Sequence, residues 1–225
     1  MSLSIIIPTL NEAETIAATL QALAPMRARG TEVIVVDGGS ADDTASRARP
    51  LADLVMSAPR GRSLQMNAGA ARARGAILLF LHADSVPPVE TDTLIVDGLS
   101  RTRRSWGRFD VRIAGRHPLL RMVETAMNLR SRWTGVATGD QGIFVTRTLY
   151  AAAGGYPEIP LMEDVALAKQ LKRFGAPLNL KHRITTSARR WEKHGILRTI
   201  LLMWRLRLAY SLGADPKQLA IRYQK

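Results

Sequence analysis

The chain has 225 residues, 46% of them hydrophobic, which is enough for one sizeable core. It contains no cysteine, and this excludes disulfides, thiolate metal sites and cysteine nucleophiles. The net charge is +13, and residues 101–132 and 181–207 each contribute +7 of it. Such localised basic surface suits phosphates, an anionic membrane face or nucleic acid.

The N-terminal apolar run has no basic region ahead of it and ends at Pro8. This pattern predicts a buried strand and no secretion signal. The sequence also lacks an apolar stretch of about 18 residues, so we expect no membrane-spanning helix. With no cysteine to place the chain in an oxidising compartment, we expect a cytoplasmic protein.

Strands and helices are expected to alternate over the first hundred residues. Apolar runs predict strands at residues 3–7, 32–36, 54–56 and 76–81. Asn11 is expected to N-cap a helix through Leu23, with Glu14 in the capping-box position. Further helices are predicted from about residue 42 and over residues 62–74. Because these strands are apolar on both faces, the sequence predicts an α/β fold with a parallel sheet between helices.

The second half of the chain is less regular. Strands are predicted at residues 106–113 and 142–146, and helices over residues 163–174 and 195–212. The sequence shows no internal repeat, low-complexity tract or linker. We therefore expect residues 1–225 to form a single domain.

Polar residues follow three of the predicted strands, at residues 8–12, 37–40 and 82–85. In open parallel sheets, ligands bind outside the carboxyl ends of the strands, so these loops predict one binding crevice. The first loop, PTLNE, contains no glycine, which argues against a dinucleotide-binding enzyme, and no P-loop lysine pattern occurs.

The combination of PTLNE, VVDGGSADDT, GRSLQMNAGAARARG and LFLHADS resembles family 2 glycosyltransferases with the GT-A fold. The later segment from GDQGIF to LMEDVALAKQLKRFG extends the resemblance to about residue 175, and small stand-alone bacterial members with HAD in the metal loop are the most similar in pattern. The resemblance implies a mostly parallel central sheet with helices on both faces. It also implies transfer of a sugar from a nucleoside diphosphate sugar, with UDP expected, to an acceptor hydroxyl or phosphate. Residues 1–100 would be the nucleotide-sugar half, 101–190 the acceptor half and 191–225 a helical segment.

The resemblance also implies roles for individual residues on the donor side. Asp37 is expected to bind the base, and Arg62 and Asn67 to lie near the base or the diphosphate. Asp84 is the expected ligand of Mn²⁺ or Mg²⁺, with diphosphate oxygens completing the coordination. The other expected nucleotide-sugar contacts are Pro8, Thr9, Asn11, Glu12, His82 and Ala83. His82 stands where the family usually has an aspartate.

On the acceptor side, the resemblance implies that Asp164, beside Glu163, is the general base. One base and no obvious nucleophile favour a single inverting displacement. Gly139, Asp140 and Gln141 are expected to shape the acceptor side, and Arg190 and Trp191 to contact the diphosphate or the acceptor.

Several alternatives stay open at this stage. Arg198 and Arg205 share one face of the last long helix, which would suit an anionic membrane surface, packing on the catalytic half or a second subunit. The acceptor is not identified, and a lipid-linked one is among the candidates. Rival functions are a sugar-phosphate nucleotidyltransferase, which would want a glycine- and arginine-rich loop after the first strand, and a non-catalytic RNA- or lipid-binding protein. Aromatic residues make up only 5% of the chain, so no nucleic-acid partner is expected.

Overall fold

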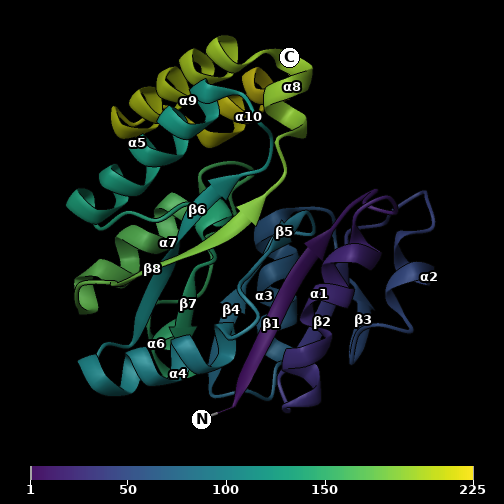
Figure 1. The fold of residues 1–225 in the computed structure, drawn as a ribbon. Helices are drawn as coiled ribbons and strands as arrows, with labels where there is room; N and C mark the ends of the chain where they lie inside the picture. Colours follow the sequence, from purple (N-terminus) through teal and green to yellow (C-terminus); the bar gives the residue numbers. More distant parts are fainter. Residues whose placement is uncertain (1, 225) are drawn as a thin grey trace.

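The structure is a computed structural model that describes residues 2–224. One eight-stranded sheet extends through the molecule, with helices on both of its faces (Figure 1). The strand order is β3-β2-β1-β4-β7-β6-β8-β5. The strands are β1 (Leu3–Thr9), β2 (Glu32–Asp37), β3 (Leu54–Ser57), β4 (Ile77–Phe80), β5 (Ser85–Val86), β6 (Trp106–Ile113), β7 (Phe144–Thr146) and β8 (Leu178–Thr186).

The helices cover both faces and one end of this sheet (Figure 1). They are α1 (Ile16–Ala28), α2 (Thr44–Ala48), α3 (Arg62–Arg72), α4 (Thr91–Thr102), α5 (Pro118–Thr134), α6 (Arg147–Ala152), α7 (Glu163–Leu171), α8 (Arg189–His194), α9 (Ile196–Ser211) and α10 (Pro216–Gln224). Two short 3-10 helices are η1 (Gly139–Gln141) and η2 (Lys172–Phe174). Within residues 2–224, no helix combines the length and the apolarity needed to cross a bilayer.

Strands β1 to β4 are mutually parallel, as the apolar runs predicted. Strand β7 is antiparallel to both β4 and β6, β8 is parallel to β6, and β5 is antiparallel to β8. The predicted α/β class with a mostly parallel sheet is therefore confirmed. The carboxyl ends of β1, β2 and β4 lie at one edge, which brings the three polar loops together.

A separate hydrophobic core lies on each face of the sheet, because alternate residues of β1 point to opposite faces. Ile5 and Ile7 pack with α1 and α4 on one face. Ile6 packs with α3, α6 and α7 on the other face. Both faces of β1 and β2 are covered, which explains why the central residues of these strands are apolar on both faces.

The predicted N-cap at Asn11 is wrong, because α1 begins at Ile16 and continues past Pro25 to Ala28. Asn11 has a left-handed backbone (φ 54°) and lies in a loop. The backbone NH groups of residues 11, 12 and 13 donate to the side chains of Ser40, Thr44 and Asp42. These groups are thus satisfied by the loop after β2, so the helix starts later than the sequence pattern indicates.

Candidate functional site

A cleft of about 250 Å³ opens at the carboxyl edge of the sheet, beneath a roof formed by α8, α9 and α10. Its floor comes from the ends of β1 and β4, from the segment around η1 and from the start of α7. The residues that line it are Pro8, Glu12, Arg62, His82, Ala83, Asp84, Thr138, Asp140, Leu161, Met162, Glu163, Asp164, Val165, Thr186, Ser187, Arg190, Trp191, Thr199, Met203, Arg207 and Tyr223.

Asp84 and Glu12 lie in the same cleft, and both form ion pairs with Arg189. The Arg189 guanidinium lies 2.7 Å from the Glu12 carboxylate and 3.5 Å from that of Asp84. All three side chains are partly exposed, so the charges are accessible to a ligand. Among residues 2–224, no three carboxylate or histidine side chains lie close enough together to hold a metal ion by themselves.

His82 pairs across the cleft with the loop that precedes β7. Its Nδ1 lies 3.2 Å from an Asp140 carboxylate oxygen, and its buried Nε2 has no hydrogen-bond partner among the described residues. A Cβ on Gly139 would come within 2.4 Å of that Nε2, so the imidazole requires glycine at this position. His82 therefore links the end of β4 to η1.

Asp164 and Glu163 open α7 and face the cleft floor. One oxygen of Asp164 accepts a hydrogen bond from the Gly139 NH, and the other accepts from the Val165 NH, both at 2.7 Å. Glu163 is 2% exposed and pairs with Arg62 at 3.2 Å. The orientation of the Asp164 carboxylate is thus fixed by backbone groups.

The pKa values of the acidic residues on the cleft floor are shifted in opposite directions. Burial raises the pKa of Asp164, and the hydrogen bonds from Gly139 and Val165 only partly offset it. Burial and the neighbouring Asp164 charge raise the pKa of Glu163. Burial alone would raise the pKa of Asp140, but the charges of His82 and Arg62 outweigh it and lower that pKa. Asp140, with its lowered pKa, is therefore the stronger acid of the two aspartates. Asp164, with its raised pKa, is the better proton acceptor.

The roof contributes positive charge to the cleft. The Arg190 guanidinium lies 3.6 Å from the centre of the Tyr223 ring and donates to the Tyr223 carbonyl. Arg207 also lines the cleft, and no carboxylate pairs with it in the described part of the chain; burial lowers its pKa. Sequence reasoning missed Arg207 as a site residue. Arg207 falls nearly opposite Arg198 on the helix, and this difference from the other arginines was the one sequence feature that could have indicated an inward position.

Some predicted site residues do not line this cleft. Asn67 is occupied elsewhere, because its amide donates to the Tyr156 carbonyl while its oxygen accepts from the Tyr150 hydroxyl and the Tyr156 NH. Asn11 binds the Ala41 NH. These side chains hold loops in place, and sequence position alone did not distinguish that role from ligand binding.

Asp37 and Thr9 are also outside the cleft lining. They are paired residues at the ends of β2 and β1, and both are buried. The Asp37 carboxylate accepts hydrogen bonds from the Gly39 and Ser40 NH groups and from the Ser40 and Thr9 hydroxyls. A base NH would have to displace one of these four, and the Ser40 hydroxyl can rotate away.

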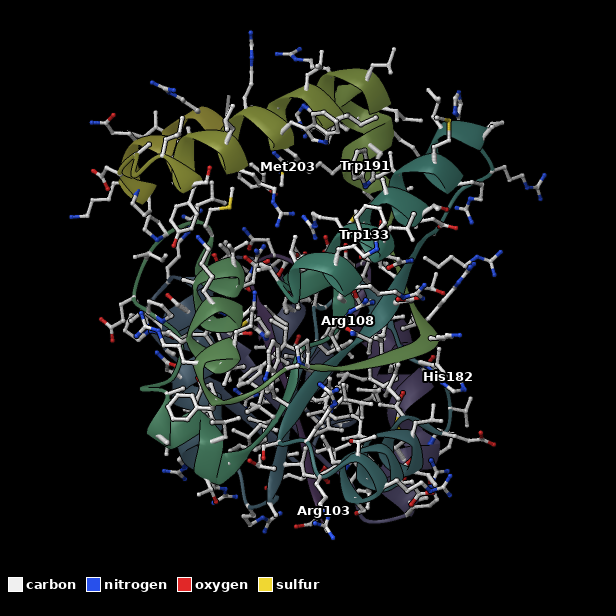
Figure 2. All side chains as sticks on the ribbon, turned by 90° about the vertical axis from the view of Figure 1, so that its left-hand side faces the viewer. Arg103, Arg108, Trp133, His182, Trp191 and Met203 are labelled. Atoms are coloured by element: carbon white, nitrogen blue, oxygen red, sulfur yellow. The ribbon has the colours of Figure 1, made fainter. Side chains whose placement is uncertain are left out.

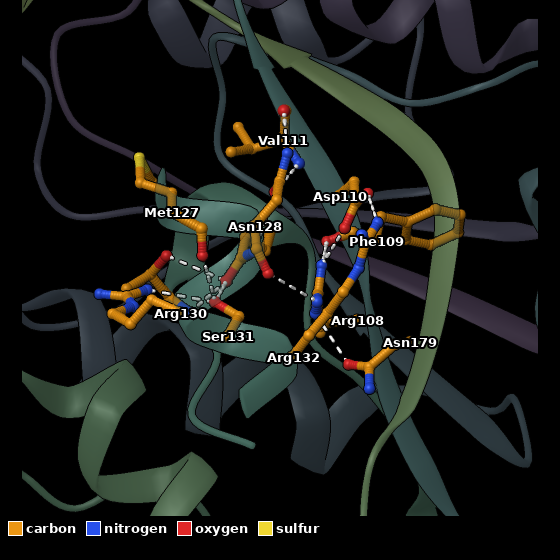
Figure 3. Close-up of polar contacts among 12 residues, drawn as sticks. Arg108, Phe109, Asp110, Val111, Met127, Asn128, Arg130, Ser131, Arg132 and Asn179 are labelled. Atoms are coloured by element: carbon orange, nitrogen blue, oxygen red, sulfur yellow. Dashed lines mark hydrogen bonds and ion pairs between the residues drawn. The ribbon is translucent and has the colours of Figure 1, made fainter. Parts of the chain in front are cut away.

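A buried polar network links α5 to β6 (Figure 3), and the buried Gln141 of η1 is part of it. Its side-chain oxygen accepts from the Ser131 hydroxyl and its nitrogen donates to Asn128. Asn128 in turn binds both the NH and the carbonyl of Val111 in β6. In the same network, Arg108 and Arg132 both pair with Asp110. The network fixes η1, whose Gly139 NH orients Asp164.

Comparison with known proteins places this architecture in one family. The model of the family "Glycosyl transferase family 2" matches residues 4–147. A probable glycosyltransferase of Bacillus subtilis, YdaM, is 26% identical over 93% of the chain, which covers 54% of that relative. The chain thus spans about half the length of this curated relative.

Two solved structures share the fold and hold nucleotides. Staphylococcus aureus TarS in complex with UDP has a TM-score of 0.69 and 21% identity, with 83% of this chain and 60% of that chain covered. The mannosyltransferase PcManGT of Pyrobaculum calidifontis, solved with GDP-Man and Mn²⁺, has a TM-score of 0.69 and 23% identity, with 98% and 64% covered. These similarities confirm the predicted GT-A fold. With the family match over residues 4–147, they establish that the chain belongs to glycosyl transferase family 2.

Proposed function

We propose that this protein transfers a sugar from a nucleoside diphosphate sugar to an acceptor hydroxyl or phosphate by a single inverting displacement. The observation that carries the proposal is that the carboxylates of Asp84 and Asp164, 80 positions apart in the sequence, line the same cleft. The family match and the nucleotides bound by TarS and PcManGT support the donor class.

Asp164 is the proposed general base. Its two backbone hydrogen bonds aim the carboxylate into the cleft, and its raised pKa makes it a stronger proton acceptor than an exposed aspartate. The acceptor oxygen attacks the anomeric carbon and gives its proton to Asp164. The bond between that carbon and the diphosphate oxygen breaks, and the nucleoside diphosphate leaves with the bonding electrons.

The residues present fit a divalent metal at Asp84. A hard carboxylate at the cleft wall suits Mn²⁺ or Mg²⁺, and the donor's diphosphate must supply most of the other ligands. When bound, the metal supplies charge neutralisation for the departing nucleoside diphosphate. Arg190 and Arg207, from the roof, are placed to hold the diphosphate or an anionic group of the acceptor.

Calorimetric titration of the protein with UDP, with and without Mn²⁺, tests the donor site. We expect tight binding only with the metal, and we expect Asp84→Asn to remove most of the difference. Asp97→Asn, at an exposed position on α4 outside the cleft, serves as the control and should keep metal-dependent binding. Equal UDP affinity in the presence of a chelator would contradict the role of Asp84. A parallel titration with GDP tests the expected preference for uracil.

A further inference from the structure

Helix α9 presents a continuous apolar row to solvent. We call this row, formed by Leu197, Leu201, Trp204, Leu208 and the following Leu212, the outer stripe. The five side chains are 64%, 62%, 71%, 62% and 79% exposed. Their spacing of three or four residues places them on one face of the helix. An aligned row of this length differs from the scattered exposed leucines that soluble proteins tolerate.

The face of α9 opposite the outer stripe packs against the rest of the protein. Thr199 and Leu206 are its buried residues, and Leu206 packs in a cluster with α7 and α10. Met203 and Arg207 face the cleft. The outer stripe is therefore directed away from every contact that anchors the helix, and its exposure does not result from a loose fit.

Positive charge borders the outer stripe on one side. Arg198 and Arg205 directly follow Leu197 and Trp204, so the two arginines lie along one edge of the row. Together with Arg190, His194 and Arg222, they line a groove between α8, α9 and α10. The sequences of α9 and α10 contain five basic residues and no acidic residue.

We propose that α9 lies in the plane of an anionic membrane surface, with the outer stripe in the apolar layer and the bordering arginines on lipid phosphates. An apolar face with a cationic border is the pattern of interfacial helices, and a tryptophan in such a face suits the boundary between water and lipid. The proposal does not depend on the glycosyl transfer reaction.

The length of α9 and the positive charge around it favour an anionic membrane surface over a second copy of the chain. A helix of 16 residues is about 24 Å long, which is shorter than the roughly 30 Å hydrocarbon layer, so α9 fits along the surface and not across it. A second copy of the chain would bring another row of arginines, and another +13 charge, against the first. An anionic bilayer has the complementary charge.

Helix α5, which contacts α9, adds apolar surface at the same end of the molecule (Figure 1). Met122, Leu129 and Trp133 are exposed on it, and Trp133 is 85% exposed. Figure 2 draws Trp133 below α9 and Arg103 at the opposite end of the molecule. The apolar surface thus gathers at the end that carries the roof of the cleft.

Flotation of the full chain with vesicles tests the proposal. We expect binding to phosphatidylcholine vesicles that contain phosphatidylglycerol, and little binding to phosphatidylcholine alone. Leu201→Gln with Trp204→Gln should lower partitioning by about tenfold or more, because two large apolar groups no longer leave water. Arg198→Gln with Arg205→Gln should lower binding to the anionic vesicles by about tenfold and remove most of the preference for anionic lipid.

Matched variants outside α8, α9 and α10 separate this effect from a general change in charge or apolarity. Arg101→Gln with Arg103→Gln removes the same charge from exposed positions, and Val89→Gln with Phe174→Gln removes exposed apolar groups. Both should leave vesicle binding within about twofold of wild type. Circular dichroism and UDP binding check that each variant is folded.

Two outcomes would overturn the proposal. The first is wild-type protein that does not float with anionic vesicles. The second is a wild-type dimer, seen by light scattering, that Leu201→Gln with Trp204→Gln converts to monomer while flotation is unchanged. That result would assign the outer stripe to a second copy of the chain.

Discussion

The carboxyl groups of Asp164 and Asp140 lie in one cleft but differ in protonation behaviour. Both are partly or wholly removed from water, which favours the neutral acid. Asp140 has His82 beside it, which lowers its pKa, whereas Asp164 is held mainly by backbone NH groups and keeps a raised pKa. Environment, and not residue type, therefore makes Asp164 the stronger proton acceptor of the two, as the proposed mechanism requires.

Asp164→Asn should lower donor turnover by about 10²- to 10⁴-fold while UDP binding is kept. In the wild type the base works only when ionised, so activity should rise as the pH passes its folded pKa. Because that pKa is raised, the acidic limb of the profile should lie above the ordinary aspartate value of about 3.9. Release of UDP from UDP-sugars, measured against pH, checks this.

Asp140→Asn is the comparison for this profile. The charge of Asp140 contributes to the raised pKa of Asp164, so its loss should move the acidic limb toward lower pH without abolishing turnover. Full activity of Asp164→Asn would remove Asp164 from the mechanism.

Arg189 pairs with Asp84, the proposed metal ligand, and with the neighbouring Glu12. Its pairs with Glu12 and Asp84 are partly exposed, and such pairs contribute about 0.2–1 kcal/mol. Arg189→Gln should therefore raise the affinity for Mn²⁺ in the absence of nucleotide by roughly two- to fivefold. Titration of Mn²⁺ by electron paramagnetic resonance measures this, with Arg183→Gln as a control on an exposed strand position. An unchanged or weaker affinity would contradict competition between Arg189 and the metal.

At the scale of elements, the polar network between α5 and β6 supports the floor of the cleft. Helix α5 turns polar residues inward, since Glu124, Asn128 and Ser131 are among its buried residues. These side chains bind the β6 backbone and Gln141, and η1 then presents the Gly139 NH to Asp164. A helix that does not line the cleft thus helps to position the Asp164 carboxylate.

Asn128→Ala should lower the free energy of unfolding by about 1–3 kcal/mol, because the buried NH and carbonyl of Val111 lose their partner. Urea denaturation measures the change. Thr125→Ala, on the exposed side of the same helix, should cost less than about 0.5 kcal/mol. Equal effects of the two substitutions would show that the network does not stabilise the fold.

The sequence was sufficient for the first half of the sheet and insufficient for α5 and β8. Strands β1, β2 and β4 are buried on both faces, so their apolar runs predicted them directly, whereas β3 is only partly buried. Helix α5 reverses the usual pattern, with Asn128 inward and Trp133 outward, and a periodicity argument cannot detect it. Strand β8 carries the exposed residues Lys181, His182 and Arg183, which conceal a strand pattern.

In the candidate site, too, some residues could be predicted from the sequence and others could not. Strand-end residues such as Asp84 could be predicted, because the ends of parallel strands converge. The role of Arg207 could not, since it depends on which face of α9 packs inward. The roles of Asn67 and Gln141 depend on partners far away in the sequence, Tyr156 and Ser131.

At the scale of the whole molecule, a single sheet joins the first hundred residues to the later part of the described chain. Strand β7 lies between β4 and β6, so the hydrogen bonds of the sheet continue across the centre. A break between the two halves would expose the edges of both. We therefore expect the chain to unfold as one unit.

Optical probes can test this expectation, because all four tryptophans lie after residue 100 and report on the second half alone. Circular dichroism reports on helices throughout the chain. In urea, the two signals should give the same midpoint and slope. Transitions that separate would show that the halves fold independently.

The apolar cluster that joins α7 to the roof has a mechanical consequence. Leu161, Met162 and Val165 flank Glu163 and Asp164 and pack against Leu206 and Leu219 of α9 and α10. Any displacement of the roof would have to loosen these contacts, so we expect opening of the cleft to change the position of the Asp164 carboxylate. We expect amide hydrogen exchange in α9, α10 and the start of α7 to slow together when a donor binds. The reason is that one apolar cluster connects the roof to the segment that carries Asp164, so both should become ordered at the same time.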